Sequence, residues 1–157
     1  MGFSNIKLLI YDCDGVLTDN RVLVDETGRE SVLFHRGDGY GIRMLKELGI
    51  EQMIVSTETN PIVARRAEKL KISVLHSVED KKTEIIKYCA SRGIALDQVM
   101  FIGNDLNDFE AMQAVGYCGC PRDAEPEIQD ISNWVSSKNG GFGVIRELYR
   151  VLSAGRK

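Results

Sequence analysis

Two aspartates separated by one residue follow an apolar run near the start of the chain. The segment YDCDGVLTDN carries Asp12 and Asp14 on either side of Cys13, directly after IKLLI. Residues two apart lie on the same side of an extended strand, and carboxylates held that close repel each other unless a cation or a shared proton intervenes. The pair is therefore either a simple loop cap or a site in which one carboxylate binds a divalent metal and attacks as a nucleophile while its neighbour moves protons.

Further carboxylates follow a later apolar run. The segment GNDLND comes directly after VMFI and contributes Asp105 and Asp108. Because the ends of parallel strands meet at one rim of a sheet, these oxygens are expected near the first pair, where they suit a hard ion such as Mg²⁺. A helix cap is the alternative explanation of Asp108.

Groups that bind anions complete the pattern. Ser56 and Thr57 close the apolar run QMIVST and offer hydroxyl and backbone N–H donors beside a helix expected to begin at Asn60. Lys81, near the start of EDKKTEII, supplies a cation. A loop hydrogen bond for Ser56 and a solvated charge for Lys81 are the ordinary alternatives. Taken together, and in this order, the residues predict a site for an anionic oxygen next to a metal.

The elements that must position these residues alternate along the chain. Short apolar runs indicate strands, and stretches with helical spacing of apolar residues lie between them. This alternation predicts an α/β fold, a Rossmann-like parallel sheet with helices on both faces, in which ligands bind where the strands end. The expected strands are 6–12, 52–57, 73–77, 98–105 and 116–120, and the expected helices are 40–50, 60–71, 79–93, 107–116 and 143–153.

One segment interrupts the alternation. Residues 21–34 hold two runs rich in Val, Leu and Phe around the turn sequence DETG, which predicts a small β-hairpin after the first strand. Such a hairpin would project from the sheet as an oligomerisation element, or it would only extend an edge. Neither a linker nor an internal repeat is visible, so residues 1–157 are expected to form a single domain.

Composition excludes several classes of function. Apolar residues make up 43% and charged residues 27% of the chain, as in ordinary globular proteins, and the formal net charge is −3. With no basic run longer than a pair, we expect neither nucleic acid nor a membrane as partner, and we expect a cytoplasmic protein. The four cysteines, Cys13, Cys89, Cys118 and Cys120, lack the spacing of a zinc or redox motif and are expected to be reduced and buried.

The segment DCDGVLTD resembles the first motif of the haloacid dehalogenase superfamily, D-x-D-G-x-[LV]-[TV]-D. Ser56, Lys81 and GNDLND fall where the second, third and fourth motifs of that superfamily lie. The resemblance implies a phosphatase in which Asp12 becomes an aspartyl-phosphate, while Asp14 protonates the leaving alcohol and later activates water.

The same resemblance assigns roles to the remaining motif residues. It implies that Ser56 and Lys81 hold the phosphoryl oxygens and that Asp108 orients Lys81 or a metal-bound water. It also implies Mg²⁺ as cofactor, bound by Asp12, the main-chain carbonyl of Asp14 and Asp105. Family members often carry Asp where this chain has Asn104.

The spacing between motifs leaves no room for a cap domain, because about 40 residues separate Asp14 from Ser56 and about 25 separate Ser56 from Lys81. The chain resembles the capless branch that acts on phosphates of eight- and nine-carbon 2-keto-3-deoxy sugar acids. Members of that branch form tetramers through the hairpin. By this resemblance a homotetramer is expected, with Gly140, Gly141 and Phe142 lining the site of a neighbouring subunit. A turn before the last helix is the alternative role of the two glycines.

The expected substrate depends on the segment STETNPIVARRAEKLK. Glu58, with Arg66 and Lys69, resembles members that act on 2-keto-3-deoxynononate or N-acetylneuraminate 9-phosphate, and Thr57 replaces the usual Gly beside them. These four residues are expected to face the substrate, although a solvated helix face would also explain Arg66 and Lys69.

Two alternatives to the nine-carbon substrate remain open. One is a 3-deoxy-D-manno-octulosonate 8-phosphate phosphatase. The other is a non-catalytic oligomerisation module related to the C-terminal domain of acylneuraminate cytidylyltransferases. Retention of Asp12, Asp14, Lys81 and Asp105 argues against the second.

Overall fold

All five apolar runs predicted as strands join one parallel sheet in the computed structural model, which describes residues 3–155. The strand order is β5-β4-β1-β6-β7-β8, so β1, which leads to Asp12, lies in the interior of the sheet. Parallel strands buried on both faces read as continuous apolar runs, as the fully buried β1 and β6 do. The strands are β1 Leu8–Tyr11, β4 Glu51–Val55, β5 Ser73–Leu75, β6 Val99–Ile102, β7 Tyr117–Cys120 and β8 Trp134–Val135.

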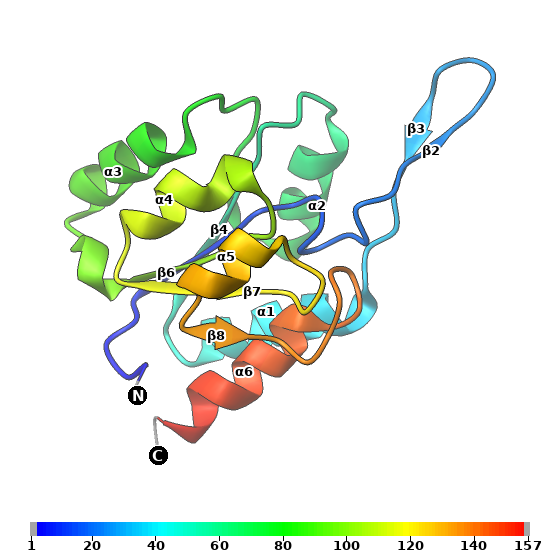
Figure 1. Cartoon of the computed structure of the whole chain (residues 1–157). Coiled ribbons are helices and arrows are strands. Elements are labelled where there is room, and N and C mark those ends of the chain that lie inside the picture. The colour runs from blue at the N-terminus through cyan, green and yellow to red at the C-terminus, as the bar shows by residue number, and fades with distance from the viewer. Residues whose placement is uncertain (1–2, 156–157) are drawn as a thin grey trace.

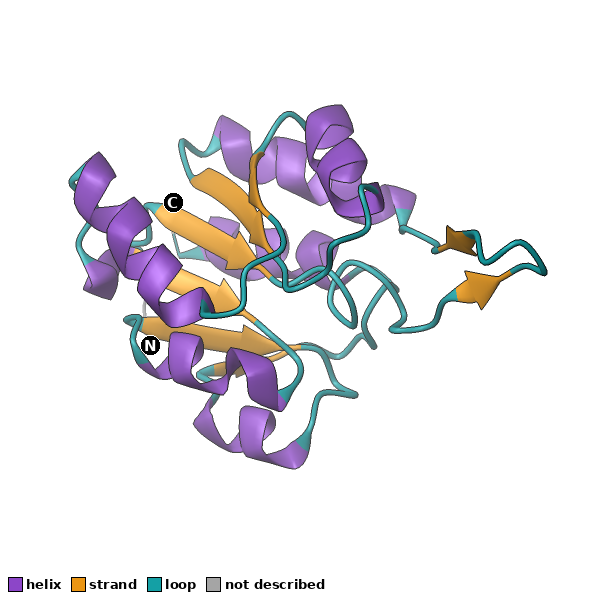
Figure 2. Ribbon diagram, turned by 90° about the horizontal axis from the view of Figure 1, so that it is seen from above, coloured by secondary structure: helices purple, strands orange, loops and turns teal. Residues whose placement is uncertain are grey.

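Helices cover both faces of the sheet (Figure 1, Figure 2). Alternate residues of β1 enter different cores, with Leu9 and Tyr11 in one and Leu8 and Ile10 in the other. The first core lies under α1 Arg36–Glu47, α2 Ile62–Leu70 and α6 Val144–Ala154; the second lies under α3 Lys81–Arg92, α4 Phe109–Gln113 and α5 Pro126–Ile131. Two short 3₁₀ turns, η1 Leu96–Gln98 and η2 Leu106–Asp108, complete the described elements. The predicted architecture is confirmed.

The hairpin is also confirmed, and it extends away from the sheet (Figure 1). Its antiparallel strands are β2 Leu23–Val24 and β3 Glu30–Ser31. The turn is held by Asp25, whose Oδ1 accepts the N–H groups of Thr27 and Arg29 at 2.9 and 3.0 Å. Apolar side chains on the hairpin face outward, and Leu23 is 73% exposed.

Helix α1 begins at Arg36, four residues before the predicted start at residue 40. Gly37 and Gly39 lie in the added first turn, and Gly41, inside the predicted helix, allows α1 and α6 to pack closely. A Cβ at Gly41 would lie 2.9 Å from Arg146 Cα. The glycine is therefore a packing residue within a helix rather than a sign of a loop.

The start of α2 and the last strand differ from the prediction in smaller ways. Helix α2 begins at Ile62 with Pro61 at the N-cap position, and Asn60, one residue earlier, accepts the Ile62 N–H through Oδ1 at 3.0 Å. The sequence did not reveal α5 or β8, which are too short to show a periodic pattern. No helix within residues 3–155 combines the length and the apolar character needed to cross a membrane.

Candidate active site

The ends of β1 and β6 bring the predicted charged residues together. Asp12 follows β1 and donates its N–H to the Ile102 carbonyl at 2.9 Å, which extends the pairing of β1 with β6. Lys81 opens α3, and its Nζ lies 2.6 Å from both Asp12 Oδ1 and Asp108 Oδ1. All three side chains are buried, with Asp108 fully inaccessible. The sequence prediction that these residues meet at one rim is confirmed.

Local hydrogen bonds hold this triad in position. Asp108 Oδ2 accepts the backbone N–H of Asn104 at 3.0 Å, which closes the turn after β6. At the start of α3, Asp80 Oδ1 accepts the Thr83 N–H at 3.0 Å and caps the helix that carries Lys81. One lysine between two carboxylates leaves the cluster with a net charge of about −1 when all three are ionised, which favours a further cation.

Burial shifts the protonation equilibria of these groups. The pKa of Asp12 is raised to about 7 by burial and by the neighbouring Asp108 charge, although Lys81 opposes the rise. Burial also acts to lower the pKa of Lys81, but attraction to Asp12 and Asp108 outweighs it and the pKa is raised. Burial, and then the charge of Glu58, raise the pKa of Asp14. A carboxyl that holds its proton more tightly suits a general acid.

Asn104 joins this cluster, and Asp105 does not. The Asn104 side-chain amide faces the main-chain carbonyl of Asp14 and Asp12 Oδ2, and with its nitrogen turned toward them it donates to both, at 2.9 and 3.1 Å. Asp105 is exposed, and its Oδ1 accepts the N–H of Leu106 at 2.7 Å. Asn104, which directly follows Gly103, thus points back to β1. Its place next to that glycine was the only feature of the sequence that could have indicated this contact.

Glycine is required at the centre of the first motif. Gly15 has a positive φ of 91°, and a Cβ there would lie 2.1 Å from the Asn104 amide. Cys13 is buried among apolar residues of the first core.

The described residues contain no group of three or more His, Cys, Asp or Glu side chains placed to bind a metal, so any ion here would draw on main-chain and amide oxygens as well.

Ser56 lies at the end of β4, where it is 2% exposed. Its N–H donates to the Leu75 carbonyl at 2.9 Å, and its Oγ accepts the Glu58 N–H at 3.1 Å. Thr57, the next residue, is exposed. The structure therefore fixes Ser56 at the predicted strand end and leaves Thr57 on the surface.

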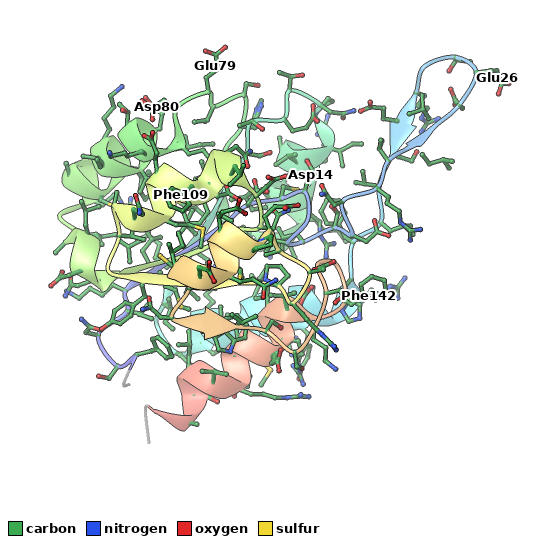
Figure 3. The ribbon with its side chains drawn as sticks, in the orientation of Figure 1. Asp14, Glu26, Glu79, Asp80, Phe109 and Phe142 are labelled. Atoms are coloured by element: carbon green, nitrogen blue, oxygen red, sulfur yellow. The ribbon has the colours of Figure 1, made fainter. Side chains whose placement is uncertain are left out.

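A cavity of about 230 Å³ opens beside Asp14, between the base of the hairpin and the start of α2. Glu30 and Glu58 line it together with Asp14, and Arg21 is the one positively charged residue among the described residues of its wall. Asn60 Nδ2 donates to Glu30 Oε2 at 3.1 Å and so joins the hairpin to α2. In Figure 3, Asp14 lies at the edge of the helical body on the side from which the hairpin extends.

Of the residues predicted to face the substrate, only Glu58 lines this cavity. Its Oε1 also accepts the N–H groups of Thr59 and Asn60, at 2.7 and 2.8 Å. Arg66 instead lies over the ring of Phe34, 4.9 Å from its centroid, and Lys69 is exposed. Neither is among the lining residues. Their role in substrate binding stays a prediction.

The glycine-rich segment before α6 packs against the first motif of the same chain. Gly141 donates its N–H to the Val16 carbonyl at 3.0 Å, and a Cβ at Gly140 would lie 1.9 Å from the Gly15 carbonyl oxygen. Phe142 is 56% exposed (Figure 3). The structure thus gives both glycines an intramolecular contact, and the predicted contribution to a neighbouring subunit stays a prediction.

Comparison with known proteins gives a consistent result. A model of haloacid dehalogenase-like hydrolases matches residues 42–148. The 3-deoxy-D-manno-octulosonate 8-phosphate phosphatase of Haemophilus influenzae is 34% identical over 146 residues, which cover 92% of this chain and 81% of the relative. The enzyme of the same name from Escherichia coli K12 is 33% identical over 153 residues, covering 95% and 80%.

Solved structures agree with the sequence comparison. An octulosonate 8-phosphate phosphatase of Moraxella catarrhalis, solved with magnesium, phosphate and KDO, superposes with a TM-score of 0.94 at 29% identity, covering 98% of this chain and 89% of that one. A structure described as a HAD family hydrolase, from Streptomyces avermitilis, has a TM-score of 0.91 at 41% identity, covering 94% and 85%. The chain belongs to the haloacid dehalogenase-like hydrolase family.

Proposed function

We propose that the protein is a Mg²⁺-dependent phosphatase that hydrolyses the phosphate monoester of a 2-keto-3-deoxy sugar acid, namely 3-deoxy-D-manno-octulosonate 8-phosphate, in the cytoplasm. The observation that carries the proposal is the buried cluster of Lys81, Asp12 and Asp108. Asp14 and Asn104 lie directly beside its Asp12. Together these residues combine a nucleophile, a proton carrier and a fixed cation at the rim of one sheet.

The residues act in two steps. A carboxylate oxygen of Asp12 attacks phosphorus; the bond from phosphorus to the sugar oxygen breaks, and Asp14 gives that oxygen its proton. Water then attacks the aspartyl-phosphate, Asp14 takes a proton from the water, and inorganic phosphate leaves with Asp12 restored. Lys81 offsets the charge of the transferring group, Asp108 holds Lys81, and Ser56 donates to a phosphoryl oxygen.

The donor set fits Mg²⁺. Neighbouring ligands of an octahedral ion at about 2.1 Å lie about 3.0 Å apart, and the Asn104 amide lies 2.9 and 3.1 Å from Asp14 O and Asp12 Oδ2. In the opposite orientation of the amide, Oδ1 faces the same two oxygens and could serve as a ligand. Asp12, the Asp14 carbonyl and Asn104 would hold the ion, in place of the Asp105 expected from sequence. The ion would neutralise charge on the phosphoryl group.

The relatives support the eight-carbon substrate over the nine-carbon one. The two curated relatives compared above carry the octulosonate name, as does the M. catarrhalis structure. The prediction of a nonulosonate 9-phosphate, based on Glu58, Arg66 and Lys69, finds no support among them. The position of Arg66 and Lys69 outside the cavity also weakens it.

A homotetramer remains part of the proposal. Val22, Leu23 and Leu33 expose 50%, 73% and 78% of their surface on or beside the hairpin, which is unusual for side chains of this kind. The cavity beside Asp14 is lined in part by residues at the base of the hairpin, Val22 among them. A neighbouring subunit seated on the hairpin would bury these residues and shield the aspartyl-phosphate from bulk water.

Phosphate release from a panel of phosphosugars tests the proposal. The panel contains octulosonate 8-phosphate, nononate 9-phosphate and N-acetylneuraminate 9-phosphate, each assayed with Mg²⁺ and again after chelation. We expect the highest kcat/KM on the eight-carbon substrate and loss of activity with the chelator. A preference for a nine-carbon substrate would restore the sequence-based prediction, and no release from any substrate would favour the non-catalytic module. Light scattering on the same samples reports the oligomeric state.

A further inference from the structure

We propose that Thr18 is a positioning residue for Asp14 and that Gly140 and Gly141 hold Thr18 in place. The glycine-rich segment before α6 would then set the direction of the proton-transferring carboxylate within its own chain. This inference rests on the proposed function, because it assigns Asp14 the role of proton donor to the leaving alcohol.

The hydrogen bonds around Thr18 fix the direction of its hydroxyl proton. Thr18 is fully buried. Its Oγ1 receives the N–H groups of Gly15 and Asn20, each at 3.3 Å, and it lies 3.3 Å from Asp14 Oδ1. A hydroxyl has two lone pairs and one proton. Since two backbone donors use the lone pairs, the single proton is directed to Asp14.

Backbone contacts fix Thr18 itself. Its N–H donates to the Cys13 carbonyl at 3.1 Å, so the loop turns back on the residue between the two aspartates. Holding Oδ1 of Asp14 in this way also sets the direction of the other carboxylate oxygen. Asp14 lines the cavity in which the substrate would lie, so that direction decides whether the proton reaches the leaving oxygen.

The glycine pair packs directly against the backbone of this loop. A Cβ at Gly141 would lie 2.5 Å from Asp19 N and 2.6 Å from the Thr18 carbonyl carbon, and Gly141 has a positive φ of 74°. A Cβ at Gly140 would lie 3.0 Å from the Thr18 carbonyl oxygen. Only glycine allows two backbone segments to approach so closely.

Both ends of the glycine segment are anchored. Gly140 donates its N–H to Asp123 Oδ1 at 2.8 Å. Beyond the segment, buried Asp38 accepts the N–H groups of Ile145 and Arg146 through Oδ1, at 2.9 and 3.0 Å, and so fixes the start of α6. Because the glycine segment is held at both ends, it is a rigid support for the loop that carries Thr18. A glycine segment without these anchors would move with that loop instead of holding it.

The test compares two substrates that differ in their need for a proton. The sugar alcohol is a poor leaving group and requires protonation, whereas p-nitrophenolate leaves without it. Single-turnover release of the leaving group isolates the first step. We expect Thr18→Val to slow release from the sugar-acid phosphate by about tenfold to a hundredfold. Release from p-nitrophenyl phosphate should change by less than about threefold, and Thr18→Ser, which keeps the hydroxyl, should restore the sugar rate.

A glycine variant tests the same role through the backbone. Gly141→Ala should show the same selective loss on the sugar-acid phosphate. Gly93→Ala is the matched control, because Gly93 also has a positive φ, of 66°, but a Cβ there would meet nothing within 4 Å. The control should keep the ratio of the two rates at the wild-type value.

The outcomes separate the inference from the proposed function. A wild-type protein that releases no phosphate overturns both. An active wild type overturns the positioning role alone if Thr18→Val keeps the full rate on the sugar-acid phosphate. The same conclusion follows if Thr18→Val slows both substrates equally, because a general disturbance of the fold would have that effect. If Thr18→Val does not fold, the ratio of the release rates on the two substrates is measured for Gly141→Ala instead. An unchanged ratio in that variant overturns the positioning role.

Discussion

The buried charge cluster and the open cavity lie side by side at the rim, yet they are built differently. In the cluster, Lys81 Nζ contacts two carboxylates at 2.6 Å, and its side chain is 1% exposed. In the cavity wall, Arg21 is 81% exposed and pairs with its near neighbour Asp19. Core strands and helix starts fix the first region, whereas loops and the hairpin form the second. The groups proposed to react are therefore preorganised, and the groups that would choose the substrate are not.

The difference has an electrostatic reason. Charges removed from water interact strongly and need partners, so the loss of one member of a buried pair is costly. Charges at the cavity mouth are screened by solvent, and each contributes little on its own. Substitutions should consequently have large effects in the cluster and small effects in the cavity, and four variants, three of them with a matched comparison, test that gradient.

The largest expected effect comes from Asp12→Asn. Loss of the nucleophile should lower kcat by on the order of 10⁴ or more. The unfolding free energy should stay near the wild-type value, because Lys81 keeps Asp108 as its partner at 2.6 Å. Steady-state phosphate release and urea unfolding measure the two quantities. A variant with wild-type turnover would remove Asp12 as the nucleophile.

Lys81→Met provides the contrast for this prediction. It leaves Asp12 and Asp108 buried without their shared cation, so unfolding free energy should fall by about 3–5 kcal/mol. Lys87→Met is the matched control, since Lys87 lies on the same helix with a 66% exposed side chain and an ion pair to Glu84. The control should change stability by less than about 1 kcal/mol. Equal losses in the two variants would mean that the cluster is no more sensitive than the surface.

The same contrast explains what the sequence could predict. The meeting of Asp12, Lys81 and Asp108 follows from the alternation of strands and helices along the chain. In a parallel sheet the carboxyl ends of the strands, and the helix starts that follow them, all lie at one rim. Which of Asn104 and Asp105 faces Asp12 depends on the geometry of one turn, and no periodic pattern records that. A shift of one residue in a turn reverses the direction of a side chain.

Sequence spacing likewise does not record the surroundings of the residues predicted to bind the substrate. The spacing of Arg66 and Lys69 shows that they share one side of α2, but it does not show what that side faces. In the structure, Arg66 packs on Phe34 instead of lining the cavity. The first turn of α1, which holds Gly37 and Gly39, lies before the predicted start at residue 40, because glycine in a helix interior is unfavourable and does not indicate a helix in the sequence.

An intermediate effect is expected where the cluster meets the proposed metal. Asn104→Ala should raise the Mg²⁺ dissociation constant by about tenfold or more, equivalent to about 1.4 kcal/mol, because it removes a ligand oxygen. Asp105→Ala should change it by less than about threefold, since that carboxylate caps Leu106 instead. Isothermal titration of Mg²⁺ into each variant measures the constants. A larger change with Asp105→Ala would restore the ligand predicted from sequence.

The smallest effect, a change in KM, is expected at Glu58. Whether KM falls or rises tells whether this part of the cavity wall repels or binds the substrate. Three carboxylates line the cavity, so Glu58→Gln should lower KM for an anionic phosphosugar by about twofold to fivefold, less so at high salt. The variant retains Oε1 to accept the Thr59 and Asn60 N–H groups, so the turn should persist. Glu26→Gln, at the tip of the hairpin (Figure 3), is the control for net charge. A raised KM would instead show that Glu58 accepts hydrogen bonds from the sugar, as predicted from its sequence position. In that case the cluster would still carry out phosphoryl transfer, but the choice of substrate would depend on the Glu58 carboxylate, which the Thr59 and Asn60 N–H groups hold in place.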